Sequence, residues 1–127
     1  MAGAIGIQLA QPQRPVVAIV GNGSAMYSIQ ALWTAAHLRL PITYVIANNR
    51  SYRILKERVL PLQGNTSEFV GMDLRDPAID FVGLGQSLGV AAERVTAPNA
   101  MEPALRKAFD HPGPSLLEII MQDGFND

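Results

Sequence analysis

Two short polar segments carry the residue types that could bind a small charged ligand. Residues 21–24 read Gly-Asn-Gly-Ser, and residues 48–51 read Asn-Asn-Arg-Ser. Glycines let the backbone approach an anion closely, and backbone N–H groups at the start of a following helix can hold a phosphate. Carboxamide and carbonyl oxygens suit a hard cation such as Mg²⁺. Together the two segments predict a site for a phosphate-bearing ligand and a divalent cation.

The two common phosphate-binding motifs of nucleotide enzymes do not match these segments. The dinucleotide pattern Gly-x-Gly-x-x-Gly needs a third glycine where Met26 stands, and no acidic residue precedes Glu57 to bind a ribose. The phosphate loop of nucleoside triphosphatases is excluded because its Lys-Ser/Thr pair is absent. Taken alone, Gly-x-Gly also fits a plain turn between a strand and a helix, so the interpretation depends on both segments together.

The residues around both segments predict the elements that would position them. Residues 15–20 and 42–47 are continuous apolar runs rich in β-branched residues, typical of strands buried on both faces of a parallel sheet. A helix is expected over 26–38, with Trp33 in its buried stripe. Ligands of open α/β sheets bind beyond the carboxyl ends of the strands, so adjacent strands would bring the two segments to one crevice.

The rest of the chain continues the alternation of helices and strands. The expected helices cover 2–10, 52–58, 80–88 and 99–109, the expected strands cover 90–95 and 116–121, and 59–79 reads as irregular. Asp80 and Asn99 stand where helix N-caps are expected. The alternation predicts a single α/β domain over residues 1–127, with an open, mostly parallel sheet and helices on both faces.

Composition and charge exclude several classes of function. The chain of 127 residues has no cysteine, so disulfides and thiol chemistry are excluded and a reducing compartment, the cytoplasm, is expected. Residues 1–56 contain no acidic residue, but the basic residues are too scattered for a nucleic-acid surface. No apolar run approaches the roughly 20 residues of a membrane-spanning helix. We therefore expect neither a nucleic acid nor a membrane as a partner.

The spacing of the two segments resembles a known cofactor motif. Gly21-x-Gly23, followed after 24 residues by Asn48-Asn49, is similar to the thiamine diphosphate motif that opens with Gly-Asp-Gly and closes with Asn-Asn. The surrounding stretches GNGSAMYSIQALW and ITYVIANNRSY resemble the cofactor-diphosphate domain of benzoylformate decarboxylase and its relatives. The resemblance covers most of the chain, is clearest over 2–55 and poorest over 59–76, and implies the thiamine diphosphate-binding fold.

The resemblance also implies roles for individual residues. The cofactor-binding residues would be Gly21, Asn22, Gly23, Ser24, Tyr27, Asn49, Ser51 and Tyr52. Mg²⁺ would be held by the side chains of Asn22 and Asn49 and by the backbone carbonyl of Ser51, and Leu55 would border the substrate pocket. Because Asn22 replaces the family's aspartate, we expect weaker metal binding. We further hypothesise that Arg50 supplies positive charge near the diphosphate.

The implied activity belongs to a longer protein. Enzymes of this kind cleave a 2-oxo acid: the cofactor's thiazolium carbanion attacks the ketone, CO₂ leaves, and the ring takes up the electrons. The family's activating glutamate comes from a different domain, so no catalytic residue is expected in this chain. We expect a C-terminal fragment of a multidomain, homo-oligomeric enzyme, inactive alone. The alternatives are an acetolactate synthase-like carboligase domain, or a non-catalytic module that has lost metal binding, which Asn22 favours.

Overall fold

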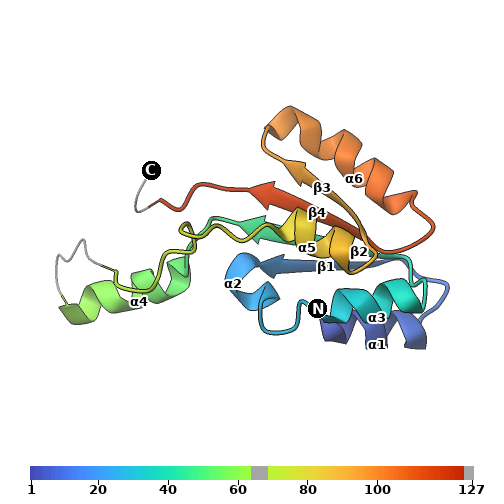
Figure 1. Ribbon diagram of the computed structural model, residues 1–127, viewed down its shortest axis with the longest axis horizontal. Coiled ribbons are helices and arrows are strands. Elements are labelled where there is room, and N and C mark those ends of the chain that lie inside the picture. Colours follow the sequence, from blue (N-terminus) through green and yellow to red (C-terminus); the bar gives the residue numbers. More distant parts are fainter. Residues whose placement is uncertain (64–68, 125–127) are drawn as a thin grey trace.

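The computed structural model describes residues 1–63 and 69–124, which form an α/β fold around one sheet (Figure 1). Its strands are β1 (Val16–Gly21), β2 (Ile42–Asn48), β3 (Ala91–Val95) and β4 (Ser115–Ile120). They lie in the order β1-β2-β4-β3, and each neighbouring pair is parallel. The open parallel sheet predicted from the sequence is therefore confirmed.

Helices cover both faces of this sheet, as predicted. They are α1 (Ala2–Ala10), α2 (Asn22–Ala25), α3 (Ala31–His37), α4 (Arg53–Gln63), α5 (Phe81–Ser87) and α6 (Met101–Phe109), with a 3₁₀ turn η1 (Pro98–Ala100). Helices α1, α3 and α5 pack on one face and α6 on the other. Helix α4 lies beyond the carboxyl ends of β1 and β2, away from the sheet (Figure 1).

The larger hydrophobic core lies between the sheet and helices α1, α3 and α5. Its side chains include Leu32, Tyr44, Phe81 and Leu116, all fully buried. Burial of Leu32, Phe81 and Leu116 contributes about 1.5–3 kcal/mol for each side chain relative to exposure. A smaller core packs α6 on β3 and β4. Together these cores fix the strands whose carboxyl ends carry the two polar segments.

Strand β1 differs from its prediction. Strand β2 is buried on both faces, but Val17 and Ile19 of β1 are exposed, Ile19 to 76%. The reason is that β1 is an edge strand in the described part of the sheet, while α6 covers only β3 and β4. An apolar run by itself does not say which helix will cover each face, so the prediction of full burial was wrong for β1.

The bounds predicted for the helix over 26–38 are also wrong. Helix α2 starts earlier, at Asn22, and α3 begins only at Ala31, with hydrogen-bonded turns between them. Trp33 is 55% exposed and stacks on His37, because the buried face of α3 is formed by its alanines and Leu32. Trp33 is therefore not a core residue.

Other element ends differ because long-range contacts take the groups that local rules assign. Asp80 precedes α5 but makes no capping hydrogen bond, since its carboxylate pairs with Arg94 at 2.9 Å. Asn99 lies inside η1 and caps nothing. Helix α4 runs to Gln63, into the segment expected to be irregular, and residues 64–68 of that segment lie outside the described residues. Across residues 1–63 and 69–124, no helix combines the length and apolar character needed to cross a membrane.

Candidate functional site

The parallel pairing of β1 and β2 brings the two polar segments to one cavity. Gly21 lies opposite Ala47 in the register, so both strands end at the same edge of the sheet. The cavity there has a volume of about 330 Å³. All predicted cofactor-binding residues except Tyr27 line it, namely Gly21, Asn22, Gly23, Ser24, Asn49, Ser51 and Tyr52. Residues of both polar segments therefore share one crevice at this edge of the sheet, and their role in binding a cofactor stays a prediction.

Two predicted residues lie elsewhere. Tyr27 stands in the turn between α2 and α3 and is 86% exposed, and Leu55 is exposed on α4. Neither side chain is part of the cavity lining. Their roles in cofactor and substrate binding therefore stay predictions.

The first asparagine of the second segment is an anchor. Asn48 is buried, and its Nδ2 donates to Oε1 of Glu118 on β4 at 2.6 Å. The other carboxylate oxygen of Glu118 accepts from Nε of Arg94 at 2.6 Å. Hydrogen bonds to a charged carboxylate are roughly twice as strong as neutral ones. These hydrogen bonds fix the end of β2 to the neighbouring strand β4.

The turn after β2 is held by its own side chains. Asn48 Oδ1 accepts the N–H of Arg50 at 2.9 Å, and Asn49 Oδ1 accepts the N–H of Ser51 at 3.1 Å. These are turns in which an asparagine side chain bonds the backbone two residues on. They hold Arg50 in the left-handed region, at a φ of 57°. The result is a tight turn that places Asn49 and Ser51 against the cavity.

Gly23 and Tyr52 join the two segments directly. A Cβ placed on Gly23 would lie only 2.5 Å from Cε1 of the Tyr52 ring. Any larger residue at position 23 would push the ring away, so glycine is required by this contact. The Tyr52 ring therefore packs on the backbone of the first segment and helps close the cavity.

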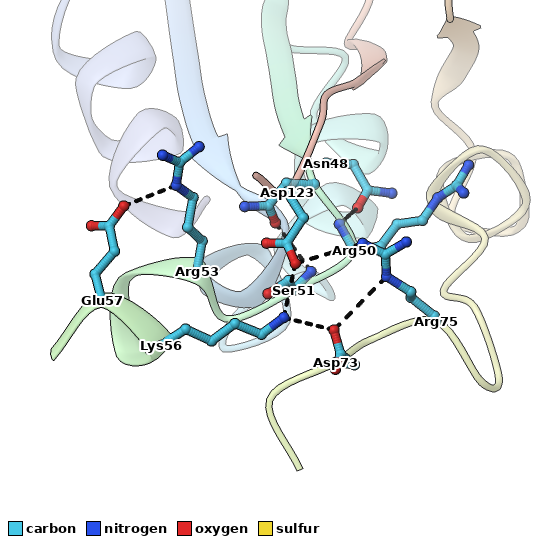
Figure 2. Close-up of polar contacts among 10 residues, drawn as sticks. Asn48, Arg50, Ser51, Arg53, Lys56, Glu57, Asp73, Arg75 and Asp123 are labelled. Atoms are coloured by element: carbon cyan, nitrogen blue, oxygen red, sulfur yellow. Dashed lines mark hydrogen bonds and ion pairs between the residues drawn. The ribbon is translucent and has the colours of Figure 1, made fainter. Parts of the chain in front are cut away.

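A network of ion pairs around the buried Lys56 holds α4 in place (Figure 2). Lys56 is fully buried, and its Nζ donates to Asp123 Oδ2 and to Asp73 Oδ1, both at 2.8 Å. Arg75 Nη2 lies 3.5 Å from the same oxygen of Asp123. The network ties the helix to the segment after β4 and to the segment before α5. The sequence did not predict this network, since Lys56 and Asp123 are 67 residues apart and no local pattern links them.

Burial and pairing oppose each other in this network. Burial lowers the pKa of Lys56, but its hydrogen bonds and attraction to Asp123 and Asp73 prevail, and the pKa is raised. Burial likewise raises the pKa of Asp123, but Lys56, with Ser51 and Arg75 adding to it, brings that pKa below its ordinary value. Both groups are therefore charged at neutral pH, and each depends on the other.

Comparison with known proteins supplies the identity of the fold. The family model described as "Thiamine pyrophosphate enzyme, C-terminal TPP binding domain" matches residues 1–119. The chain belongs to this family. The predicted resemblance is thereby confirmed.

Relatives within the family include two kinds of enzyme. The chain is 39% identical to the "Putative acetolactate synthase large subunit IlvX" of Mycobacterium tuberculosis, over 93% of this chain and 24% of the relative. It is 37% identical to benzoylformate decarboxylase of Pseudomonas aeruginosa, over 94% of this chain and 22% of the relative. The chain thus spans less than a quarter of the length of these proteins.

Solved structures agree with the observed fold. A thiamine diphosphate-dependent 4-hydroxybenzoylformate decarboxylase of Rhodococcus jostii superposes with a TM-score of 0.86 at 36% identity, covering 94% of this chain and 22% of that one. Benzoylformate decarboxylase of Polynucleobacter necessarius gives a TM-score of 0.81 at 29% identity, with the same coverage of each chain. The thiamine diphosphate-binding α/β fold expected from the sequence is confirmed.

The donors at the cavity fit the diphosphate of this family's cofactor. Asn22 is 4% exposed, and its Nδ2 donor is buried without a hydrogen-bond partner in the protein. A buried donor normally has an acceptor, so an anionic group in the cavity would satisfy it. Arg53 also lines the cavity.

The same residues do not fit a resident Mg²⁺ ion. Protein-bound Mg²⁺ usually has one or two carboxylate ligands besides phosphates and waters. The predicted ligands Asn22, Asn49 and Ser51 offer only neutral oxygens, and the carboxylate at the cavity, Glu57, pairs with Arg53 at 2.9 Å. Within the described ranges, no three Asp, Glu or His residues gather in a way that could hold a metal ion.

An arginine that was not singled out from the sequence lines the cavity. Arg53, at the start of α4, lines the cavity, whereas Arg50 does not. The hypothesis that Arg50 supplies positive charge near the diphosphate stays a prediction, and Arg53 is a second candidate for that role. The signal for Arg53 was present in the sequence as an Arg-Glu pair four residues apart, which predicts a helix beginning at that point.

Proposed function

We propose that the chain is the thiamine diphosphate-binding domain of a 2-oxo acid decarboxylase resembling benzoylformate decarboxylase. The observation that carries the proposal is the convergence of residues 21–24 with Asn49, Ser51 and Tyr52 on one cavity. The benzoylformate decarboxylase relatives, at 37% identity in sequence and a TM-score of 0.86 in structure, support the choice of reaction class.

In this proposal the chain's own residues bind and orient the cofactor. The backbone at Gly23 and the hydroxyl of Ser24 contact the diphosphate, while Asn22 and Arg53 donate hydrogen bonds to its oxygens. Tyr52, packed on Gly23, closes the cavity on one side. The bound cofactor supplies a thiazolium carbon that adds to the ketone of a 2-oxo acid and accepts the electrons released with CO₂. Leu55 borders the substrate.

The remaining requirements lie outside these residues. The glutamate that activates the cofactor comes from another domain, so the chain alone has no turnover. The whole protein works as a homo-oligomer in the cytoplasm. Exposed Ile54, Leu55 and Leu62 on α4 support an interface there, since clustered apolar side chains often mark contact surfaces. The predicted Mg²⁺ takes no part in this proposal, because its protein ligands carry no negative charge.

Calorimetry and turnover assays test the proposal. Thiamine diphosphate is titrated into the protein expressed from its complete coding sequence, with thiamine as the control ligand that lacks a diphosphate. We expect saturable binding of thiamine diphosphate only. CO₂ release from benzoylformate should then exceed release from pyruvate. Failure to bind thiamine diphosphate with or without Mg²⁺ would refute the proposed function.

A carboligase of the acetolactate synthase kind is the second candidate. It is favoured by the 39% identity to the acetolactate synthase relative. Formation of acetolactate from pyruvate, with little decarboxylation of benzoylformate, would select it. A non-catalytic module is favoured by Asn22 and would bind the cofactor without turnover of either substrate.

A further inference from the structure

We propose that this cavity binds the cofactor's diphosphate without a divalent cation, through the carboxamide of Asn22 and the guanidinium of Arg53. The inference rests on the proposed function, since it takes thiamine diphosphate as the ligand. It concerns how the same site compensates the diphosphate charge. In this proposal, hydrogen-bond donors of the protein compensate the diphosphate charge, in place of the Mg²⁺ ion that the sequence motif predicts.

The first observation is the state of Asn22. Asn22 is only 4% exposed, yet its Nδ2 has no acceptor among the described residues, and the residue lines the cavity. Native proteins pair more than nine in ten buried polar groups, so an NH₂ group in this position needs an acceptor from outside the chain. A phosphate oxygen is such an acceptor.

The second observation is the charge around the cavity. A carboxamide can rotate to exchange its oxygen and nitrogen, so charge decides which ligand it meets. The charged side chains at the cavity are Arg53 and Glu57, and they pair with each other at 2.9 Å through one N–H of the guanidinium. Guanidinium has five N–H donors and binds phosphate well. The pair has no net charge, but the guanidinium keeps N–H groups beyond the one bonded to Glu57, and these can donate to an anion beside Asn22.

The third observation concerns the predicted metal ligands. Asn49 Oδ1 already accepts the N–H of Ser51 at 3.1 Å, and its role in holding the turn limits its freedom to coordinate an ion. Neither Asn22 nor Asn49 nor the Ser51 carbonyl brings negative charge. Mg²⁺ gives up its waters reluctantly and needs near-octahedral geometry, so three neutral oxygens are a weak protein site for it.

Calorimetry with and without a chelator tests this inference. The protein from its complete coding sequence is titrated with thiamine diphosphate and, separately, with inorganic pyrophosphate, in EDTA and in excess Mg²⁺. We expect both ligands to bind in EDTA, with dissociation constants within about threefold of those in Mg²⁺, a difference worth less than one direct hydrogen bond. Binding of both ligands only in Mg²⁺ would overturn the inference and leave the proposed function intact.

Variants identify the residues responsible. Arg53→Gln should weaken binding in EDTA by about tenfold or more, the loss expected for one charge-assisted hydrogen bond. Arg58→Gln, an exposed arginine of the same helix outside the cavity, is the matched control and should leave binding unchanged. An equal loss in both arginine variants would contradict a direct contact from Arg53.

The Asn22→Asp variant tests the carboxamide without changing its shape. It replaces the NH₂ donor with a negative oxygen, so we expect binding in EDTA to fall and binding in Mg²⁺ to become the stronger of the two. The ratio of the two dissociation constants should change by about tenfold or more, since one donor becomes a repulsive charge. Thermal unfolding of each variant checks that it is folded. An unchanged ratio would overturn the role given to Asn22.

Discussion

Two groups of polar residues adjoin the turn at residues 48–51 and differ in how they are bonded. We call the first group the front; it lies at the cavity and comprises Asn22, Arg53 and Glu57. We call the second group the rear; it comprises Lys56 with Asp73 and Asp123, and Asn48 with Glu118. In the front, Asn22 has a buried donor without a partner, and Arg53 is held only by a half-exposed pair. In the rear, Lys56 is fully buried between two carboxylates, and Asn48 is bonded to a buried glutamate. Lys56 and Asn48 are engaged with the protein, although Oδ1 of Asp123 has no hydrogen-bond partner, whereas the Nδ2 donor of Asn22 lies at the cavity, where a ligand can accept from it.

This difference shows how the chain divides stability from binding. A buried ion pair costs desolvation of both charges, and it persists only when geometry and further hydrogen bonds repay that cost. Lys56 achieves this with two contacts at 2.8 Å. An unpartnered donor such as Asn22 Nδ2 costs stability in the free protein, and a ligand that accepts from it recovers that free energy. The hydrogen bonds of Lys56 and Asn48 therefore stabilise the turn that carries the cavity residues.

Breaking the rear network gives the largest effect. Lys56→Met keeps most of the length of the side chain but leaves Asp123 fully buried with its main cation removed. We expect the free energy of unfolding to fall by about 3–5 kcal/mol, the usual result when one partner of a buried pair is lost. Urea unfolding measures it, with the exposed Arg58→Met as a control that should change stability by less than about 0.5 kcal/mol. Similar values for both variants would remove the distinction between the two regions.

Lowering the pH should reduce the contribution of Asp123 to the free energy of unfolding. Asp123 has a lowered pKa when folded, so its contribution is present above its unfolded pKa of about 3.9 and is lost as the pH falls through its folded pKa. In Lys56→Met, the pKa of Asp123 should instead be raised by burial, so acid would relieve the penalty. The gap in unfolding free energy between wild type and variant should therefore shrink from pH 7 to pH 3. A constant gap would show that Asp123 is not the group responsible.

Much of this arrangement was accessible from the sequence because it depends on local patterns. Apolar runs gave the strands to within about a residue at each end, such as Ser115–Ile120 for the expected 116–121. The rule that ligands bind at the carboxyl ends of parallel strands then placed both polar segments at one cavity. The family resemblance added the choice of cofactor.

The rest depended on contacts between distant residues. Residues 15–20 and 42–47 have similar composition, yet only β2 is buried on both faces, since its neighbours and covering helices decide burial. Arg50 and Arg53 differ by three positions, and the start of α4 decides which one reaches the cavity. The partner of Lys56 is 67 residues away, beyond any pattern in the local sequence.

The neighbouring asparagines offer a more local comparison of rear and front. Asn48→Ala removes the donor to buried Glu118, and we expect it to cost about 1–3 kcal/mol of unfolding free energy. Asn49→Ala removes one turn hydrogen bond and should cost no more than about 1 kcal/mol, but it should weaken thiamine diphosphate binding. Chemical unfolding and calorimetry on both variants measure the two effects. If Asn49→Ala were the more destabilising, the assignment of anchor and ligand-facing residue would be reversed.

The smallest effect on stability is expected at the front, where Glu57 pairs with Arg53. Both side chains are 49% exposed, so Glu57→Gln should change the unfolding free energy by only about 0.3–0.5 kcal/mol. The same change removes a negative charge from the cavity and frees the guanidinium, so diphosphate binding in EDTA should strengthen by about twofold, which corresponds to the free energy of an exposed pair.

Glu102→Gln is the matched control for that change. Glu102 and Arg106 form an exposed pair with the same four-residue spacing on α6, at 2.8 Å and remote from the cavity. It should reproduce the small loss of stability without altering affinity, as measured by urea unfolding and calorimetry. If Glu57→Gln weakened diphosphate binding instead, the carboxylate would have to act by orienting Arg53. The front of the turn would then be positioned by its own ion pair, as the rear is by Lys56.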